Sequence, residues 1–183
     1  MTKVFWIGSL ITLCAIGAAI PTEARDFPKK PYDAMYTTTG PTGSSTMRLA
    51  CDGKGHVMSE TQNGPMRIIS IYDYPANLFS IVRPEQRRVT KLPMTDEQAS
   101  QFDENATVTQ KGKPLGSKVI SGHPCKGWLF TPSEGMQMEN WLADDIRLSV
   151  KRIVTTKMGT STTVLSSYSA SAPPDSAFVV PAY

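Results

Sequence analysis

The sequence predicts a mainly β protein of the α+β class, built from an antiparallel meander with one or a few covering helices. Short runs rich in Val, Ile, Thr and Tyr recur about every 8 to 12 residues, the spacing typical of consecutive antiparallel strands. The 183-residue chain holds 13 Gly and 14 Pro, more turn-forming residues than a helical bundle tolerates. Only one stretch, beginning at Thr95, carries the signals of a helix start.

Six strands are expected in the first half, over residues 32–38, 46–51, 56–62, 66–72, 78–83 and 88–92. The strand at 46–51 alternates Met47, Leu49 and Cys51 with more polar neighbours, which predicts one buried and one solvated face. Asp52 and Gly53 follow it and favour a hairpin turn, since this pair accepts positive φ angles. The strands at 66–72 and 78–83 are apolar on both faces, so we expect a covering layer on each side.

The predicted helix runs from Thr95 to about Phe102. Thr95 is a suitable N-cap residue, and Asp96 and Glu97 place negative charge in the first turn, where the helix dipole favours it. Ala99 and Phe102 fall on one face. This helix is therefore expected to cover one side of the sheet.

The second half repeats the hairpin pattern, with strands expected at 117–121, 126–131, 137–143, 147–157 and 162–171. Gly135, the pair Asp144 and Asp145, and the pair Met158 and Gly159 supply the turns. A Pro-rich, extended tail follows at 173–183. Residues 32–183 are thus expected to form a single β-rich domain.

Residues 1–24 have the organisation of a secretory signal peptide. Lys3 precedes an apolar run at 4–20, and Thr22-Glu23-Ala24 ends in a small residue suited to cleavage. We expect cleavage near Ala24, an N-terminal arm at 25–31, and a periplasmic or secreted protein. An uncleaved membrane anchor stays open as the alternative, because 17 mostly apolar residues approach the ~20 that span a bilayer.

Cys51 and Cys125 are the only cysteines that remain after removal of the signal segment. An even pair in an oxidising compartment is typically a disulfide. A metal site or a reactive thiol is less favoured, because zinc-type Cys/His spacing and a catalytic partner are both missing from the sequence.

The sequence gives little support for an enzyme, a metalloprotein or a nucleic-acid-binding protein. It has two histidines and no nucleophile, Walker, dinucleotide or His-Glu-x-x-His motif, so no cofactor is expected. His123, Cys125, Met136 and Met138 are the nearest approach to a soft copper site, but a disulfide at Cys125 would remove its thiolate. A net charge of +3 makes nucleic acid an implausible partner, whereas basic strand faces suit membrane-surface contact with anionic headgroups.

Four short stretches of the second half carry a family resemblance. Residues 118–128 read KVISGHPCKGW, and residues 138–145 read MENWLADD, followed by LSVK at 148–151. Together with the terminal FVVPAY at 178–183, they resemble exported bacterial proteins with the LolA-like lipoprotein-carrier half-barrel. This resemblance implies a strongly curved antiparallel sheet, helices across its open side, and an apolar cavity that holds acyl chains. Only one helix is predicted here, fewer than the carrier has.

We therefore expect a non-enzymatic, monomeric binding protein for a lipid, an acyl chain, a lipoprotein or another hydrophobic ligand. The alternative is a structural or protein-interaction module of the cell envelope with a packed interior. Strand parity suggests six residues as ligand-lining: Ile69, Ile71, Phe79, Ile81, Met138 and Trp141. Asn105 begins a glycosylation sequon, meaningful only in a host that modifies such sites.

The first testable prediction is that Cys51 and Cys125 are bonded in the exported protein. Intact mass before and after reduction and alkylation measures this directly, and two thiols that alkylate without reduction would contradict it. The bond would close a loop of about 75 residues, worth roughly 4 to 5 kcal/mol in the chain-entropy model. Replacing either cysteine is expected to lower the free energy of unfolding by about 2 to 5 kcal/mol.

Overall fold

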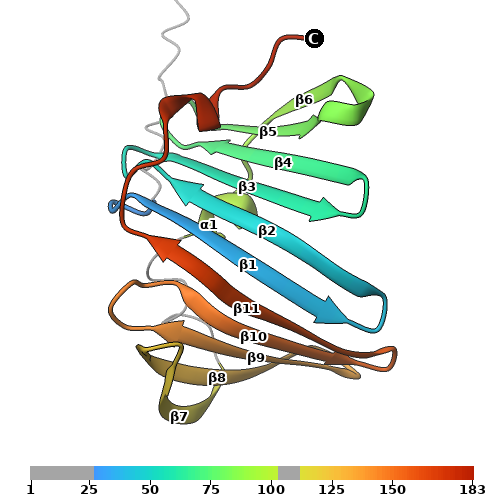
Figure 1. Ribbon diagram of the computed structural model, residues 1–183, viewed down its shortest axis with the longest axis vertical. Helices are drawn as coiled ribbons and strands as arrows, with labels where there is room; N and C mark the ends of the chain where they lie inside the picture. Colours follow the sequence, from blue (N-terminus) through green and yellow to red (C-terminus); the bar gives the residue numbers. More distant parts are fainter. Residues whose placement is uncertain (1–26, 103–111) are drawn as a thin grey trace, which may run out of the picture.

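A computed structural model describes residues 27–102 and 112–183 of the chain. Its eleven strands form one antiparallel sheet in the order β6-β5-β4-β3-β2-β1-β11-β10-β9-β8-β7 (Figure 1). The expected signal peptide at 1–24 and the sequon at Asn105 lie outside the described residues. Within these, no helix is both long and apolar enough to cross a membrane.

The first half of the sheet is a six-stranded meander that ends in the helix α1. Thr95 caps α1 with a complete capping box, in which its hydroxyl accepts from the Gln98 amide while the Gln98 side chain accepts from the Thr95 amide. The elements are β1 (Tyr32–Gly40), β2 (Gly43–Cys51), β3 (His56–Asn63), β4 (Met66–Asp73), β5 (Leu78–Arg83), the 3₁₀ helix η1 (Pro84–Gln86), β6 (Arg88–Pro93) and α1 (Asp96–Ser100).

The second half is a five-stranded meander followed by the C-terminal segment. Its elements are β7 (Lys113–Ile120), β8 (His123–Ser133), β9 (Met136–Ala143), β10 (Ser149–Thr156), β11 (Gly159–Ser169) and the 3₁₀ helix η2 (Asp175–Phe178). The expected strands are therefore all present with bounds shifted by a few residues. The tail, expected to be extended throughout, contains the short turn of η2.

The two meanders join where β1 pairs with β11. Seven residue pairs make this ladder, from Asp33 opposite Ser169 to Thr39 opposite Thr162. A bulge between Met35 and Tyr36 interrupts the register. A bulge bends its strand and increases the local twist, so it contributes to the curvature of the sheet at its centre.

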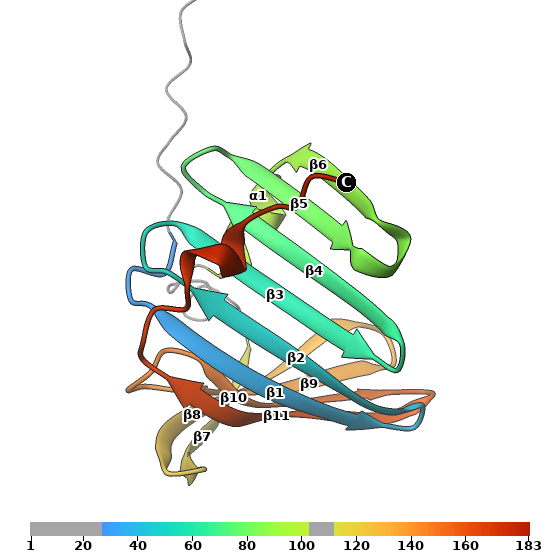
Figure 2. The same ribbon diagram turned by 45° about the horizontal axis from the view of Figure 1, so that its top comes forward.

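The sheet is curved and unclosed, with different segments covering its two faces. α1 lies on one side of it, while η2 and the C-terminal residues cross the other side (Figures 1 and 2). We call the face that carries α1 the inner face and the opposite one the outer face. This is the half-barrel architecture that the sequence predicts, and α1 is the one covering α-helix within residues 27–102 and 112–183.

The outer face is covered by the C-terminal tail. Ala50, Met58 and Ile71 form a small buried cluster there, against which Phe178 and Val180 pack. The tail thus provides the second covering layer that the doubly apolar strand β4 requires, because each face of a buried strand needs its own apolar partners.

The turn between β2 and β3 is organised by Asp52. One of its carboxylate oxygens accepts from the backbone amides of Lys54 and His56 at 2.7 and 3.0 Å, and the other lies 2.6 Å from Nδ1 of His56. Burial opposes ionisation of Asp52, but these hydrogen bonds outweigh it and hold its pKa below the ordinary value. Gly53 and Gly55 adopt φ angles of 72° and 110°, which the turn requires and which glycine adopts freely.

Candidate ligand-binding cavity

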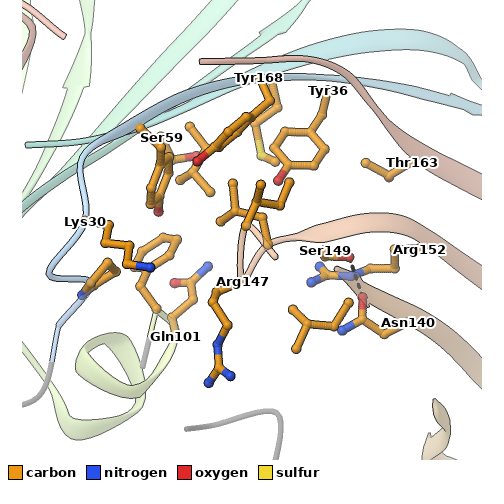
Figure 3. Close-up of a pocket in the computed structure, with 18 of the residues that line it drawn as sticks. Lys30, Tyr36, Ser59, Gln101, Asn140, Arg147, Ser149, Arg152, Thr163 and Tyr168 are labelled. Carbon is orange, nitrogen blue, oxygen red and sulfur yellow. Dashed lines mark hydrogen bonds between the residues drawn. The ribbon is translucent and has the colours of Figure 1, made fainter. Parts of the chain in front are cut away.

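A cavity of about 250 Å³ lies between the inner face of the sheet and the end of α1 (Figure 3). Strands from both meanders contribute to it, since β1, β2, β9, β10 and β11 all supply side chains. Its apolar and aromatic wall consists of Pro28, Tyr32, Tyr36, Met47, Leu49, Phe102, Leu142, Ile146, Leu148 and Tyr168.

The floor of the cavity is formed by well-buried side chains of the central strands. Tyr36 of β1 is 5% exposed, Leu49 of β2 is 8% exposed and Leu142 of β9 is 9% exposed. Burial raises the pKa of Tyr36 strongly, and the nearby positive charge of Arg152 only partly offsets this. The Tyr36 phenol therefore stays neutral at physiological pH, which keeps the floor uncharged.

The end of α1 is fixed over the cavity by side chains from the region of β4. The hydroxyl of Tyr74 donates to the carbonyl oxygen of Ala99 at 2.8 Å, and the hydroxyl of Tyr72 donates to Oε1 of Gln101 at 3.0 Å. The Tyr72 ring also meets the edge of the Phe102 ring, with centroids 4.8 Å apart. Two hydrogen bonds and one aromatic contact thus position the covering segment.

One side of the wall is polar. Asn140 of β9 is 6% exposed and accepts from the hydroxyl of Ser149 at 2.5 Å. A register shift lies between Ser149 and Lys151 in the pairing of β10 with β9, next to this hydrogen bond. Thr163 of β11 completes this side and is bonded to Thr38 at 2.8 Å.

Four charged side chains also line the cavity: Lys30, Asp145, Arg147 and Arg152. All four are exposed, so they stand where the cavity opens to solvent rather than at its floor. The single acid, Asp145, lies 2.7 Å from Nδ1 of His123, and this hydrogen bond lowers its pKa. The cavity therefore has an apolar floor and a predominantly cationic rim.

The predicted facing of β4 and β5 was wrong. Ile71 pairs with Ser80, whereas Phe79 pairs with Tyr72, so the two predicted residues lie on opposite faces. Ile69 and Ile71 belong to the outer face under the tail, while Phe79 and Ile81 lie on the inner face, since Phe79 pairs with Tyr72, whose hydroxyl donates to Gln101 at the end of α1. Alternation holds within each strand, but the register between β4 and β5 is set by their connection, residues 74–77, and alternation alone does not predict it.

Trp141 was also assigned to the wrong face. It pairs with Gly127 and Lys151, whereas its neighbour Asn140, which lines the cavity, pairs with Arg152. Trp141 is 6% exposed because it packs over Gly127 on the outer side, with the Lys118 ammonium 3.5 Å from its ring centroid. Met138 shares the parity of Asn140 but is absent, like the other five predicted residues, from the described wall.

The residues missed by the sequence analysis carried a detectable signal. Tyr32, Ala34 and Tyr36 alternate with Asp33 and Met35, as expected of a strand with one buried face. Register places Met47 opposite Tyr36 and Leu49 opposite Ala34, so the two apolar alternations share the inner face. The alternation in 46–51 predicts a buried face, but only the pairing of β2 with β1 places that face in the cavity wall.

Cys51 and Cys125 are both buried, and no bond joins their sulfur atoms in the structure. The Cys51 thiol approaches the carbonyl oxygen of Pro28 at 3.5 Å, and the Cys125 thiol donates to the carbonyl oxygen of His123 at 3.1 Å. Burial raises the pKa of Cys125, which does not favour a reactive thiolate. The disulfide stays a prediction. Among the described residues, no cluster of His, Cys, Asp and Glu could hold a metal ion.

The sequence matches no known protein-family model and no curated protein. Solved structures with a similar fold do exist. An uncharacterized conserved protein from Thermus thermophilus is 7% identical, with a TM-score of 0.62 over 84% of this chain and 86% of that one. The complex of MucA and MucB from Pseudomonas aeruginosa gives 15% identity and a TM-score of 0.54. A LolA superfamily protein from Nitrosomonas europaea gives 9% identity and a TM-score of 0.42, over 85% of this chain and 93% of that one.

These similarities concern the fold. The match to the MucA/MucB complex covers 84% of this chain but 56% of the other, so the chain spans little more than half the length of that protein. The strongly curved antiparallel sheet that the resemblance at residues 118–151 and 178–183 implies is present in the structure, and the Thermus thermophilus protein and the MucA/MucB complex share this fold.

The second testable prediction concerns the attachment of α1. Tyr74→Phe removes the donor to the buried Ala99 carbonyl without removing the ring, so the free energy of unfolding should fall by about 1 to 3 kcal/mol. Hydrogen exchange should accelerate at the α1 amides, including that of Ala99. Tyr183→Phe, at an exposed position in the tail, is the matched control and should change neither quantity. Unchanged exchange in Tyr74→Phe would show that this bond does not hold α1.

Proposed function

We propose that the protein is an exported binding protein that holds a hydrophobic molecule, such as a lipid or an acyl chain, in the inner cavity without covalent chemistry. The observation that carries this proposal is the cavity itself. Its buried floor of Tyr36, Leu49 and Leu142 is uncharged, and it lies between a curved sheet and a helix end. Ligand sites are typically concave, mostly apolar and supplied with a few polar groups, which matches this wall.

The size of the cavity favours a small or single-chain ligand. Its volume of about 250 Å³ lies just below the range of about 300 to 1,000 Å³ common for small-molecule sites. The cavity is also open on the side of its charged rim, so a longer ligand can extend out of it. We therefore expect the cavity to bind one acyl chain. The proposal also includes that the protein is a monomer and works in the periplasm or outside the cell.

The alternative proposal is a protein-interaction module. It is supported by β7, which is exposed along almost its whole length and forms one end of the sheet. Val119 on this strand is 70% exposed. An edge strand of this kind can accept an extended segment of another protein. The similarity of fold to the MucA/MucB complex is consistent with this role but does not identify a partner for this protein.

The third testable prediction is that filling the cavity abolishes ligand binding. Ser59 of β3 lines the cavity and is half-buried, and Ser59→Phe would place an aromatic ring in that space. A fluorescence titration of residues 25–183 with the uncharged probe N-phenyl-1-naphthylamine should show saturable binding for the native protein. The same titration should show at least about tenfold weaker binding for Ser59→Phe, a change of about 1.4 kcal/mol or more.

Thr46→Phe is the matched control, since Thr46 is exposed on the neighbouring strand β2 and alternates with the cavity residue Met47. It adds the same ring outside the cavity and should bind the probe like the native protein. Circular dichroism verifies that both variants are folded. A native protein that shows no saturable binding would favour the interaction module, and unchanged binding by a folded Ser59→Phe protein would place the ligand elsewhere.

A further inference from the structure

We propose that the ligand is an anionic amphiphile whose acidic group binds Arg152 at the rim of the cavity, with Lys30 as the second cation. This inference rests on the proposed function and specifies the chemistry of the ligand. It predicts selectivity for lipids with a carboxylate or phosphate end over neutral lipids with the same chain.

The charged side chains of the cavity wall favour an anionic ligand. Three cations and one acid line the cavity, and the acid, Asp145, is already bonded to His123. An opening lined by one sign of charge attracts ligands of the opposite sign. A cationic ligand would meet three like charges here, whereas an anion would meet two or more attractive groups.

The position of Arg152 on β10 leaves its charge available to a ligand. It lies on the inner face of β10, between Asn140 of β9 and Thr163 of β11, and both of these flanking residues are uncharged. By contrast, two other strand arginines are neutralised by neighbours: Arg48 lies 2.6 Å from Asp33, and Arg67 lies 2.6 Å from Glu60. Within residues 27–102 and 112–183, no ion pair of this kind is formed by Arg152.

The cationic side chains differ in the direction in which they point. Figure 3 shows the guanidinium of Arg152 turned toward the middle of the cavity, close to Ser149 and Asn140, and the Lys30 ammonium turned inward from the other side. Arg147 points away from the cavity in the same view. Arg152 and Lys30 are therefore the two cations placed to meet a ligand group at the opening.

The combination of floor and rim matches an amphiphile. An acyl chain placed on Tyr36 and Leu49 loses contact with water, while its acidic end stays at the exposed rim. The guanidinium group binds both carboxylate and phosphate through paired hydrogen bonds. The source of the anion, a free fatty acid or a single-chain phospholipid, is therefore decided by experiment.

The fourth testable prediction compares competitors of bound N-phenyl-1-naphthylamine. Oleate, oleoyl lysophosphatidic acid and oleyl alcohol share one chain and differ in their polar end. We expect either anionic lipid to displace the probe from the native protein at about tenfold lower concentration than oleyl alcohol, as a charge-assisted hydrogen bond would give. The better of the two anions identifies a carboxylate or a phosphate source.

Arg152→Gln should bring the displacing concentrations of both anionic lipids to that of oleyl alcohol, each measured against the probe bound to the same variant, and Arg152→Lys should retain part of the preference. Lys151→Gln is the matched control, because it removes one charge from the adjacent residue on the outer face of β10. Equal displacement by all three competitors from a native protein that binds the probe would overturn this inference and leave the proposed function standing. A native protein that does not bind the probe would overturn both.

Discussion

The pairing of β1 with β11 is the constraint on which the rest of the structure depends. Each meander is connected by short turns, but this ladder joins residues about 130 positions apart, such as Thr37 and Val164. Its loop-closure entropy is compensated only when the two halves share a buried face. Tyr36 and Leu165 meet across this ladder, and both are buried. One continuous curved sheet, rather than two small ones, is the result.

The cavity follows from that constraint. Tyr36 and Met47 come from the first meander and Leu142 and Asn140 from the second, so the wall exists only when β1 and β11 are paired. α1 then covers part of the concave space without filling it, because it has only five residues and one buried side chain, Ala99. The covering layer is thus held by specific hydrogen bonds from Tyr72 and Tyr74 rather than by a broad apolar helix face.

Local signals in the sequence were sufficient for the strands, the turns and the capped helix, because alternation, Asp-Gly turns and the Thr95 cap act between near neighbours. Facing was not predictable for Ile71 and Phe79, because the register of β4 against β5 depends on the geometry of their connection. The cavity wall was harder still, since it combines alternating residues of strands from both halves of the chain. The sequence does not show which arginines form ion pairs. Only the structure shows that Arg48 and Arg67 are paired with carboxylates while Arg152, among the described residues, is not.

The central claim is that the space between sheet and helix is a binding site and not a packing defect. Native mass spectrometry of the protein, purified from its own host without detergent, tests this most directly. We predict a population that carries one small molecule, released on gentle activation and extractable into organic solvent, with an acidic group and an acyl chain. A single species at the mass of the polypeptide alone, after purification that retains lipid on a known lipid carrier, would contradict it.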